Sequence, residues 1–188
     1  MENKLKLIAI VQARYSSSRL PGKILKKFKK LSYLEILIKR LKKSKKLDKI
    51  IVAISKNPND KKIEKICEKL NISHFTGSEN DVIDRYFKAA KFFKAENIAR
   101  ITADCPLTDP KIVDEVARNF FQKNADYATN TLPPTFPDGL DVEIFNYKTL
   151  HNAWKASRKN KRFREHVTTH IRENKNIKKI NIKFQEDF

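Results

Sequence analysis

The fold is decided by the stretch Leu5-Lys6-Leu7-Ile8-Ala9-Ile10-Val11, which runs directly into a polar loop that ends at Lys23. After Lys6 the stretch is uninterrupted and rich in branched apolar residues, which is typical of a strand buried on both faces of a parallel sheet. Similar runs recur at residues 50–54 and 98–102. The sequence therefore predicts a sheet whose central strands are parallel.

Helical patterns lie between these runs, with apolar residues three and four positions apart at residues 34–41, 63–70 and 82–90. Asp109 offers an N-cap, and Pro110 suits the first helical position, so a further helix is expected to about residue 124. Strand and helix alternate through this half of the chain. A layered α/β domain follows.

The second half of the chain predicts a looser mixture of elements. Strands are expected at residues 126–131, 139–147 and 177–184, a Pro-rich loop at residues 132–138, and helices at residues 149–157 and 163–173. The length of 188 residues fits one domain, residues 1–188, with one substantial core.

The composition favours a positively charged protein of the cytoplasm. The net charge is +19, and the positive electrostatic field of such a protein attracts polyanions. The lysine runs at residues 26–30 and 39–46 also read as solvated faces.

Cys67 and Cys105 lie far apart, outside any C-x-x-C pair, which argues against a disulfide framework and a zinc site. The first apolar run is too short for an export signal or a membrane span, so no membrane partner is expected.

The loop at residues 12–23 is the first candidate for phosphate binding, because ligands of open α/β sheets bind at the carboxyl ends of strands. It contains neither G-x-G-x-x-G nor the Walker lysine motif, which disfavours a dinucleotide site and a P-loop. Three consecutive serines let backbone N–H groups approach an anion, and Arg14, Arg19 and Lys23 supply cations. An exposed basic turn is the alternative.

A family resemblance enters at this loop. VQARYSSSRLPGK at residues 11–23 resembles the opening motif of the SpsF-like, spore coat polysaccharide branch of the cytidylyltransferases, to which the acylneuraminate and deoxy-manno-octulosonate enzymes are more distantly related. The resemblance continues, in family order, through TGSENDVIDRY at 76–86, RITADCPLTDP at 100–110, PDGLDVE at 137–143 and REHVT at 164–168. The chain has three glycines, at positions 22, 77 and 139, and each lies inside one of these motifs, where a bend or close backbone approach would require it.

The resemblance implies a Rossmann-like fold of the nucleotide-diphospho-sugar transferase type, with a mostly parallel central sheet and helices on both faces. It also implies an enzyme that transfers a nucleoside monophosphate from an NTP, with CTP favoured, to a sugar phosphate or sugar acid for surface polysaccharide or glycan biosynthesis. Pyrophosphate is released, and Mg²⁺ is the expected cofactor. The oligomeric state is left open between a monomer and a homodimer.

The resemblance also assigns residues to roles. The catalytic residues are expected to be Arg14, Lys23 and Asp104. Asp81 and Arg85 are expected to border the nucleotide, although their i,i+4 spacing also suits an intrahelical ion pair. The expected nucleotide-binding residues are Gln12, Ala13, Arg14, Ser16, Ser17, Ser18, Arg19, Lys23, Asp81 and Arg85.

Asp104 follows a buried strand, so its carboxylate should emerge at the carboxyl end of the sheet, where it could be a hard oxygen ligand for Mg²⁺. The resemblance makes it the metal ligand, and capping of the next turn is the alternative. Family members continue into a further strand and a second aspartate. On that comparison the chain is expected to lack its C-terminal strand and the second metal ligand, and to turn over poorly unless Asp138 or Asp141 substitutes.

The acceptor is expected to meet a group of polar residues late in the chain. Asp141 and Glu143 share one face of the expected strand by two-residue periodicity, and solvent-facing edge residues are the alternative. Arg164 suits a carboxylate or phosphate. His166 and His170 fall four positions apart on the expected helix and could bind zinc. The motif H-E-x-x-H is absent, however, which disfavours a metalloprotease. The expected substrate-binding residues are Asp138, Asp141, Glu143, Arg164 and His166.

Two other functions compete with this interpretation. A nucleic-acid-binding module would use the net charge and exposed aromatic residues, but Phe92, Phe93, Phe120 and Phe121 fall within helical patterns that fit a core better. No nucleic-acid partner is therefore expected. A glycosyltransferase of related fold usually shows Asp-x-Asp, and no such triplet occurs in the chain.

Overall fold

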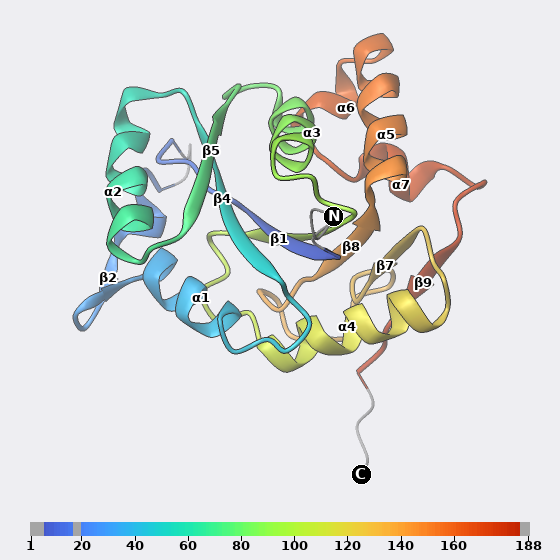
Figure 1. The fold of residues 1–188 in the computed structure, drawn as a ribbon, viewed down its shortest axis with the longest axis horizontal. Helices are drawn as coiled ribbons and strands as arrows, with labels where there is room; N and C mark the ends of the chain where they lie inside the picture. The colour runs from blue at the N-terminus through green and yellow to red at the C-terminus, as the bar shows by residue number, and fades with distance from the viewer. Residues whose placement is uncertain (1–5, 17–19, 185–188) are drawn as a thin grey trace, which may run out of the picture.

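The computed structural model describes residues 6–16 and 20–184, and these form a seven-stranded sheet in the order β5-β4-β1-β6-β8-β7-β9 (Figure 1). β8 is antiparallel to β6 and β7, and the other neighbouring pairs are parallel, which confirms a mostly parallel sheet. The strands are β1 (Leu7–Gln12), β4 (Lys49–Ser55), β5 (Ser73–Gly77), β6 (Asn97–Thr102), β7 (Tyr127–Thr129), β8 (Glu143–Asn146) and β9 (Lys179–Asn181).

Helices cover both faces of the sheet (Figure 1). α1 (Tyr33–Leu41), α2 (Lys61–Lys69) and α4 (Pro110–Gln122) bury their apolar residues on one face. α3 (Val82–Phe92), α5 (Tyr147–Lys159) and α7 (Thr169–Glu173) do so on the other, with the one-turn helix α6 (Arg162–Glu165) beside α5. The Rossmann-like α/β architecture predicted from the sequence is confirmed.

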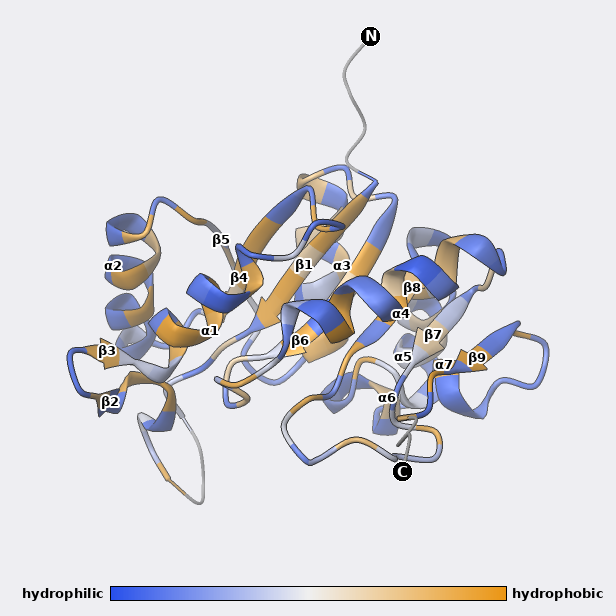
Figure 2. Ribbon diagram, turned by 90° about the horizontal axis from the view of Figure 1, so that it is seen from below, coloured by the Kyte–Doolittle hydropathy of each residue, from blue (hydrophilic) through white to orange (hydrophobic). Residues whose placement is uncertain are grey.

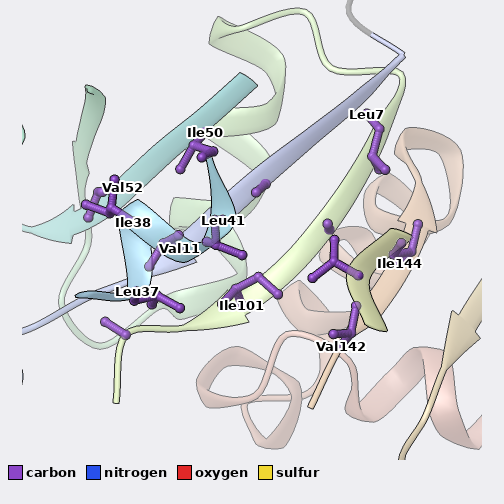
Figure 3. Packing of buried hydrophobic residues seen from close by; sticks show 14 of the residues in the cluster. Leu7, Val11, Leu37, Ile38, Leu41, Ile50, Val52, Ile101, Val142 and Ile144 are labelled. Carbon is purple, nitrogen blue, oxygen red and sulfur yellow. The ribbon is translucent and has the colours of Figure 1, made fainter. Parts of the chain in front are cut away.

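The core under α1 shows how the sequence pattern becomes packing (Figure 3). Leu37, Ile38 and Leu41 are fully buried against Val11 and Val52 of the central strands. Figure 2 shows the apolar sides of α1 and α4 turned toward the sheet. Each such side chain contributes roughly 1.5–3 kcal/mol when it is fully buried, so this layer holds the central strands rigidly in place.

Two helix starts are capped by side chains, and the one at Asp109 was predicted from the sequence. Asp109 caps α4 by accepting a hydrogen bond from the Lys111 N–H at 2.7 Å, and Pro110 occupies the first helical position. α1 begins with a capping box in which Ser32 accepts from the Glu35 N–H and Glu35 accepts from the Ser32 N–H. Such caps satisfy backbone donors that the first turn leaves unpaired.

Several predicted elements differ in the structure. β5 was not expected, because His74 and Thr76 interrupt its apolar pattern and only one of its sides is paired. Residues 27–32 form a two-stranded hairpin, β2 (Lys27–Phe28) with β3 (Leu31–Ser32), inside what reads as a solvated lysine run. The strands predicted at 126–131, 139–147 and 177–184 shorten to β7, β8 and β9.

The single helix predicted at residues 163–173 is wrong. The chain forms α6, becomes extended at His166 (φ −115°, ψ 114°), and then forms α7. The break lets Val167 and Ile171 both pack, fully buried, into the core on the α3 side of the sheet. His166 and His170 therefore do not lie on one helix.

The aromatic residues assigned to the core divide between core and surface. Phe120 is buried, but Phe92 is 69% exposed and Phe121 is 43% exposed, so the core assignment is wrong for these two. Phe93 is half-buried, with the Lys49 ammonium 4.8 Å from its ring centroid. Among the helices of residues 6–16 and 20–184, none has the length and apolar character needed to cross a membrane.

Candidate active site

The candidate site lies where β1, β4 and β6 end together. Gln12, the last residue of β1, is in register with Ala53 of β4 and Thr102 of β6. Beyond the strands, the Ala13 N–H donates to the Ala53 carbonyl at 3.1 Å and the Ala103 N–H donates to the Gln12 carbonyl at 2.9 Å. The loops that follow β1 and β6 therefore leave the sheet side by side, as the position of ligand sites in α/β sheets requires.

Lys23 and Asp104 meet at this edge. The Lys23 ammonium lies 3.6 Å from the Asp104 carboxylate, and the two side chains are 39% and 48% exposed. Lys23 begins the short 3₁₀ helix η1 (Lys23–Leu25), while Asp104 stands two residues after β6. A cation and a carboxylate that face each other in contact with water are both accessible to a ligand.

Tyr15 and Gly22 are joined by a hydrogen bond at the base of the loop that carries Arg14 and Lys23, and we call this pair the neck of the loop. The Gly22 N–H donates to the Tyr15 carbonyl at 2.9 Å, and Gly22 has φ +69°. The positive φ favours glycine at this position, and a Cβ there would lie 2.8 Å from a carbon of the Tyr15 ring, which would have to shift. Ser17, Ser18 and Arg19, predicted to bind phosphate, lie outside the described residues.

A polar cluster of Ser16, Asn57 and Glu79 supports the part of the loop that follows β1. The Ser16 hydroxyl donates to the Glu79 carboxylate at 2.7 Å, and the Asn57 amide donates to the same carboxylate at 3.2 and 3.3 Å. These hydrogen bonds, aided by the charges of Arg14 and Arg85, hold the pKa of Glu79 below its usual range. Arg14 itself is exposed.

Gln12 and Ala13 lie at the carboxyl end of β1, where the loop begins. Ala13 is 1% exposed, and the Gln12 side-chain oxygen is buried with no hydrogen-bond partner in the part of the chain that the structure describes. A buried acceptor without a donor is costly in a finished protein interior. Gln12 therefore presents an unused hydrogen-bonding group at the end of β1.

Arg85 lies inside the protein. It is fully buried, donates to the Ser78 carbonyl at 2.5 Å, and its Nε and Nη2 have no partner among the described residues. Burial lowers the pKa of its guanidinium. Gly77 packs so closely that a Cβ there would lie 2.8 Å from the Arg85 Cγ. Arg85 thus supports the 77–81 loop from within, and a direct nucleotide contact stays a prediction.

Asp81 joins the loop at residues 77–81 to α6. Its carboxylate caps α3 by accepting from the Asp84 N–H at 3.1 Å and lies 3.7 Å from the Arg164 Nε. Arg164 also donates to the Ser157 carbonyl at 3.3 Å. His166 is exposed at the residue that ends α6. Arg164 is thereby brought next to Asp81, whereas no described contact ties His166 to it.

Carboxylates gather around Cys105. Burial raises the pKa of the Cys105 thiol, and the charges of Asp104, Asp141 and Asp138 raise it further. Partial desolvation and the neighbouring Asp138 and Glu143 likewise raise the pKa of Asp141. The charges of Asp104, Asp138 and Asp141 therefore all act on the Cys105 thiol. No set of three or more Cys, His, Asp or Glu residues within residues 6–16 and 20–184 is arranged to hold a metal alone.

Glu143 is turned into the interior. β8 begins at Glu143, so Asp141 lies outside the strand, and the expectation that the two share one face is wrong. The Glu143 side chain is 3% exposed, and its oxygens accept hydrogen bonds from Arg100 at 2.5 Å, Tyr127 at 2.5 Å and Arg172 at 3.1 Å. Burial alone would raise the pKa of Glu143, but the two guanidinium groups outweigh burial and lower it.

Comparison with known proteins identifies the family. Residues 8–188 match the sequence model of the cytidylyltransferase family. The chain belongs to this family. It is therefore a nucleotidyltransferase, and its family members use CTP as their donor.

Individual relatives agree with this assignment. The spore coat polysaccharide biosynthesis protein SpsF of Bacillus subtilis is 32% identical over 88% of this chain and 70% of its own length. The uncharacterized protein MJ1063 of Methanocaldococcus jannaschii is 43% identical over 94% of this chain and 71% of its own. The resemblance to the SpsF-like branch seen in the motifs is confirmed.

Solved structures share the fold of this cytidylyltransferase. A cytidylyltransferase from Leptospira borgpetersenii serovar Hardjo-bovis superposes with a TM-score of 0.91 at 36% identity, covering 97% of this chain and 78% of the other. A CMP:2-keto-3-deoxy-manno-octonic acid synthetase, solved with CTP, gives a TM-score of 0.72 at 14% identity, with 95% and 90% covered. The second likeness shows the common fold alone.

Sequence reasoning missed three side chains that support the candidate site. Asn57 and Glu79 hold Ser16, and Asp60 accepts a hydrogen bond from the Tyr15 N–H at 2.6 Å. Residues 57–60 read as an ordinary polar turn. They follow the carboxyl end of β4, so the strand-end rule applied to residues 12–23 and 104 could also have pointed to them.

Proposed function

We propose that this enzyme transfers CMP from CTP to a sugar phosphate or a sugar acid, with release of pyrophosphate. The observation that carries the proposal is the accessible pair of Lys23 and Asp104 at the common end of β1 and β6, in which a cation for phosphate faces a carboxylate suited to a divalent metal. The octonic acid synthetase has the same fold and was solved in complex with CTP, which supports the choice of nucleotide. The role named for SpsF supports a product used in polysaccharide synthesis.

The chain's own cations have a clear task in this reaction. An oxygen of the acceptor attacks the α-phosphorus of CTP, the bond from that phosphorus to the bridging oxygen breaks, and pyrophosphate leaves. Negative charge shifts toward pyrophosphate, and the proposed role of Arg14 and Lys23 is to neutralise it. Arg14 is exposed one residue before the loop neck and Lys23 directly follows it. The reaction requires no covalent intermediate with the enzyme.

Asp104 fits a magnesium ion that arrives with the nucleotide. Mg²⁺ commonly takes one or two carboxylates together with phosphate oxygens and water, and does not need a complete protein cage. The half-exposed carboxylate of Asp104, with Asp138 and Asp141 nearby, matches that pattern. Bound there, the ion would neutralise charge on the phosphates.

The acceptor is proposed to lie between the Pro-rich loop and α6. Asp138 and Asp141 are exposed on one side and suit sugar hydroxyl groups as hydrogen-bond acceptors. Arg164 and His166 lie on α6 and at its end, and Arg164 suits the phosphate or carboxylate of the acceptor. Glu143 has both carboxylate oxygens occupied within the protein, so its proposed contribution is support for the Asp141 loop.

The test is pyrophosphate release from each of the four NTPs with Mg²⁺, in the presence of a panel of sugar phosphates and sugar acids. CTP should support the fastest release, with at least one acceptor required, and product mass should equal acceptor plus CMP. Release that is equal with all four NTPs would overturn the choice of CTP. A complete lack of acceptor dependence would overturn the transfer reaction.

A further inference from the structure

We infer that Asp60 is a positioning residue for the triphosphate loop, because its carboxylate holds the neck of that loop to the end of β4. This inference rests on the proposed function in so far as residues 12–23 bind the triphosphate. Asp60 lies 45 positions from Tyr15 in sequence and outside every motif that carried the family resemblance.

The carboxylate of Asp60 is directed away from its own helix. Asp60 occupies the N-cap position of α2, where an aspartate usually accepts from the backbone of the first turn, yet it makes no such hydrogen bond. It is 1% exposed, and its Oδ1 accepts from the Tyr15 N–H at 2.6 Å. Its Oδ2 accepts from the Ser55 N–H at 3.0 Å and the Ser55 hydroxyl at 2.6 Å.

The cost of burying this carboxylate points to its purpose. A buried charge is unfavourable unless hydrogen bonds satisfy it, and three donors do so here. Two of the donors belong to Ser55, at the end of β4, and the third belongs to Tyr15, three residues beyond β1. The carboxylate therefore joins a fixed strand end to the start of the loop.

Both proposed phosphate-binding cations flank the residues that this contact holds. The Tyr15 N–H bonds to Asp60, and the Tyr15 carbonyl accepts from the Gly22 N–H at 2.9 Å. Arg14 precedes Tyr15, and Lys23 follows Gly22 and meets Asp104 at 3.6 Å. The Asp60 carboxylate thus fixes the backbone positions from which the Arg14 and Lys23 side chains extend. A misplacement of about 1 Å in such a group costs about a hundredfold in rate.

The experiment compares Asp60→Asn with a matched control, Asp48→Asn. The Asp48 carboxylate also accepts a backbone N–H next to β1, that of Leu7 at 2.8 Å, but at the opposite end of the strand. In Asp60→Asn, kcat/KM for CTP should fall by about tenfold to a hundredfold, with a raised KM for CTP and an unchanged KM for the acceptor. In Asp48→Asn, both KM values should stay within about twofold of those of the parent protein.

Hydrogen exchange of the free protein keeps this test separate from that of the proposed function. In Asp60→Asn the amides of Tyr15 and Gly22 should exchange faster, whereas in Asp48→Asn only Leu7 should. Faster exchange in a protein that uses no NTP would uphold the positioning role and reject the reaction. A folded Asp60→Asn with unchanged exchange and kcat/KM would overturn the role of Asp60. If the variant fails to fold, a Tyr15 amide that is unprotected in the parent protein overturns it as well.

Discussion

Two ion pairs near the carboxyl end of β6 differ in how far their side chains are exposed to water. Lys23 and Asp104 stand 3.6 Å apart with side chains 39% and 48% exposed, whereas Arg100 and Glu143 stand 2.5 Å apart with a carboxylate only 3% exposed. Arg100 lies in β6 and Asp104 follows the same strand, so the two pairs are four residues apart along one element. Their surroundings, and not their chemistry, separate them.

The difference in exposure decides which of the two ion pairs can give up its contact in order to bind a ligand. An exposed pair gains about 0–1 kcal/mol from its contact, so a triphosphate or a metal can replace either member at little cost. A buried pair that loses one member leaves an uncompensated charge, at a cost of about 3–5 kcal/mol. The first pair is therefore available for ligands, and the second, together with Arg172, holds β6, β8 and α7 together.

Removal of the Glu143 charge should have the largest effect on stability. Glu143→Gln would remove the counter-charge of Arg100, whose side chain is 20% exposed, and of Arg172, whose side chain is 36% exposed. The carboxylate they share is itself buried, so the free energy of unfolding in urea should fall by about 3–5 kcal/mol. The control is Glu173→Gln, which removes an exposed pair with Arg162 and should cost less than about 1 kcal/mol. Equal losses in the two variants would break the comparison.

Removal of the Lys23 charge should affect turnover instead. Lys23→Ala should lower kcat/KM for CTP by about a hundredfold to a thousandfold, because a cation at the leaving pyrophosphate acts in the transition state. The free energy of unfolding should change by less than about 1 kcal/mol, since the pair with Asp104 is exposed. Steady-state pyrophosphate release and urea unfolding measure the two quantities. A variant with parental turnover would remove Lys23 from the reaction.

Asp104→Asn should change the response to magnesium. The amide keeps the size of the side chain but loses the charge that a hard divalent ion prefers, so the Mg²⁺ concentration for half-maximal rate should rise by roughly tenfold to a hundredfold. A magnesium titration at saturating CTP provides the measurement. An unchanged titration curve would show that the ion is held elsewhere.

Glu35 is an intermediate case and gives a pH test. Burial raises the pKa of its carboxyl, but hydrogen bonds from Ser32 and the ammonium of Lys69 outweigh burial and lower the pKa from 4.5 to about 2. Because the folded pKa is the lower one, the stabilisation is complete above pH 4.5 and is lost as the pH falls toward 2. In Glu35→Gln the free energy of unfolding should therefore depend less steeply on pH in that window. An unaltered slope in acid titrations would contradict the shift.

The parts of the fold that the sequence predicts are those in which one pattern decides the outcome. β1, β4 and β6 are buried on both faces, so their apolar runs are unambiguous, and the strand-end rule then brings residues 12–23 and Asp104 together. β5 is paired on one side only and carries polar residues, which hides it. The break at His166 depends on where Val167 finds a core, and no local signal shows that.

The unpredicted parts of the site depend on partners far away in sequence. Glu143 reads as a polar strand residue because Arg100 and Arg172 lie 43 and 29 positions away. Asp60 lies in what reads as a polar turn, because its partner Tyr15 lies 45 positions away. A carboxylate's role is set by whichever donors the finished fold places around it, so composition and spacing alone leave it open.

The closed neck at Tyr15 and Gly22 also bears on how such an enzyme diversifies. A 2.9 Å hydrogen bond between Tyr15 and Gly22 joins the two ends of the segment between them, so the rest of the fold needs only these ends to be fixed. Doubling the length of such a segment costs only about 0.6 kcal/mol in closure entropy. Insertions and substitutions there would be tolerated by the scaffold and selected only for what they bind. The hydrogen bond between Tyr15 and Gly22 therefore marks the two positions between which a segment of different length could be joined to the same fold.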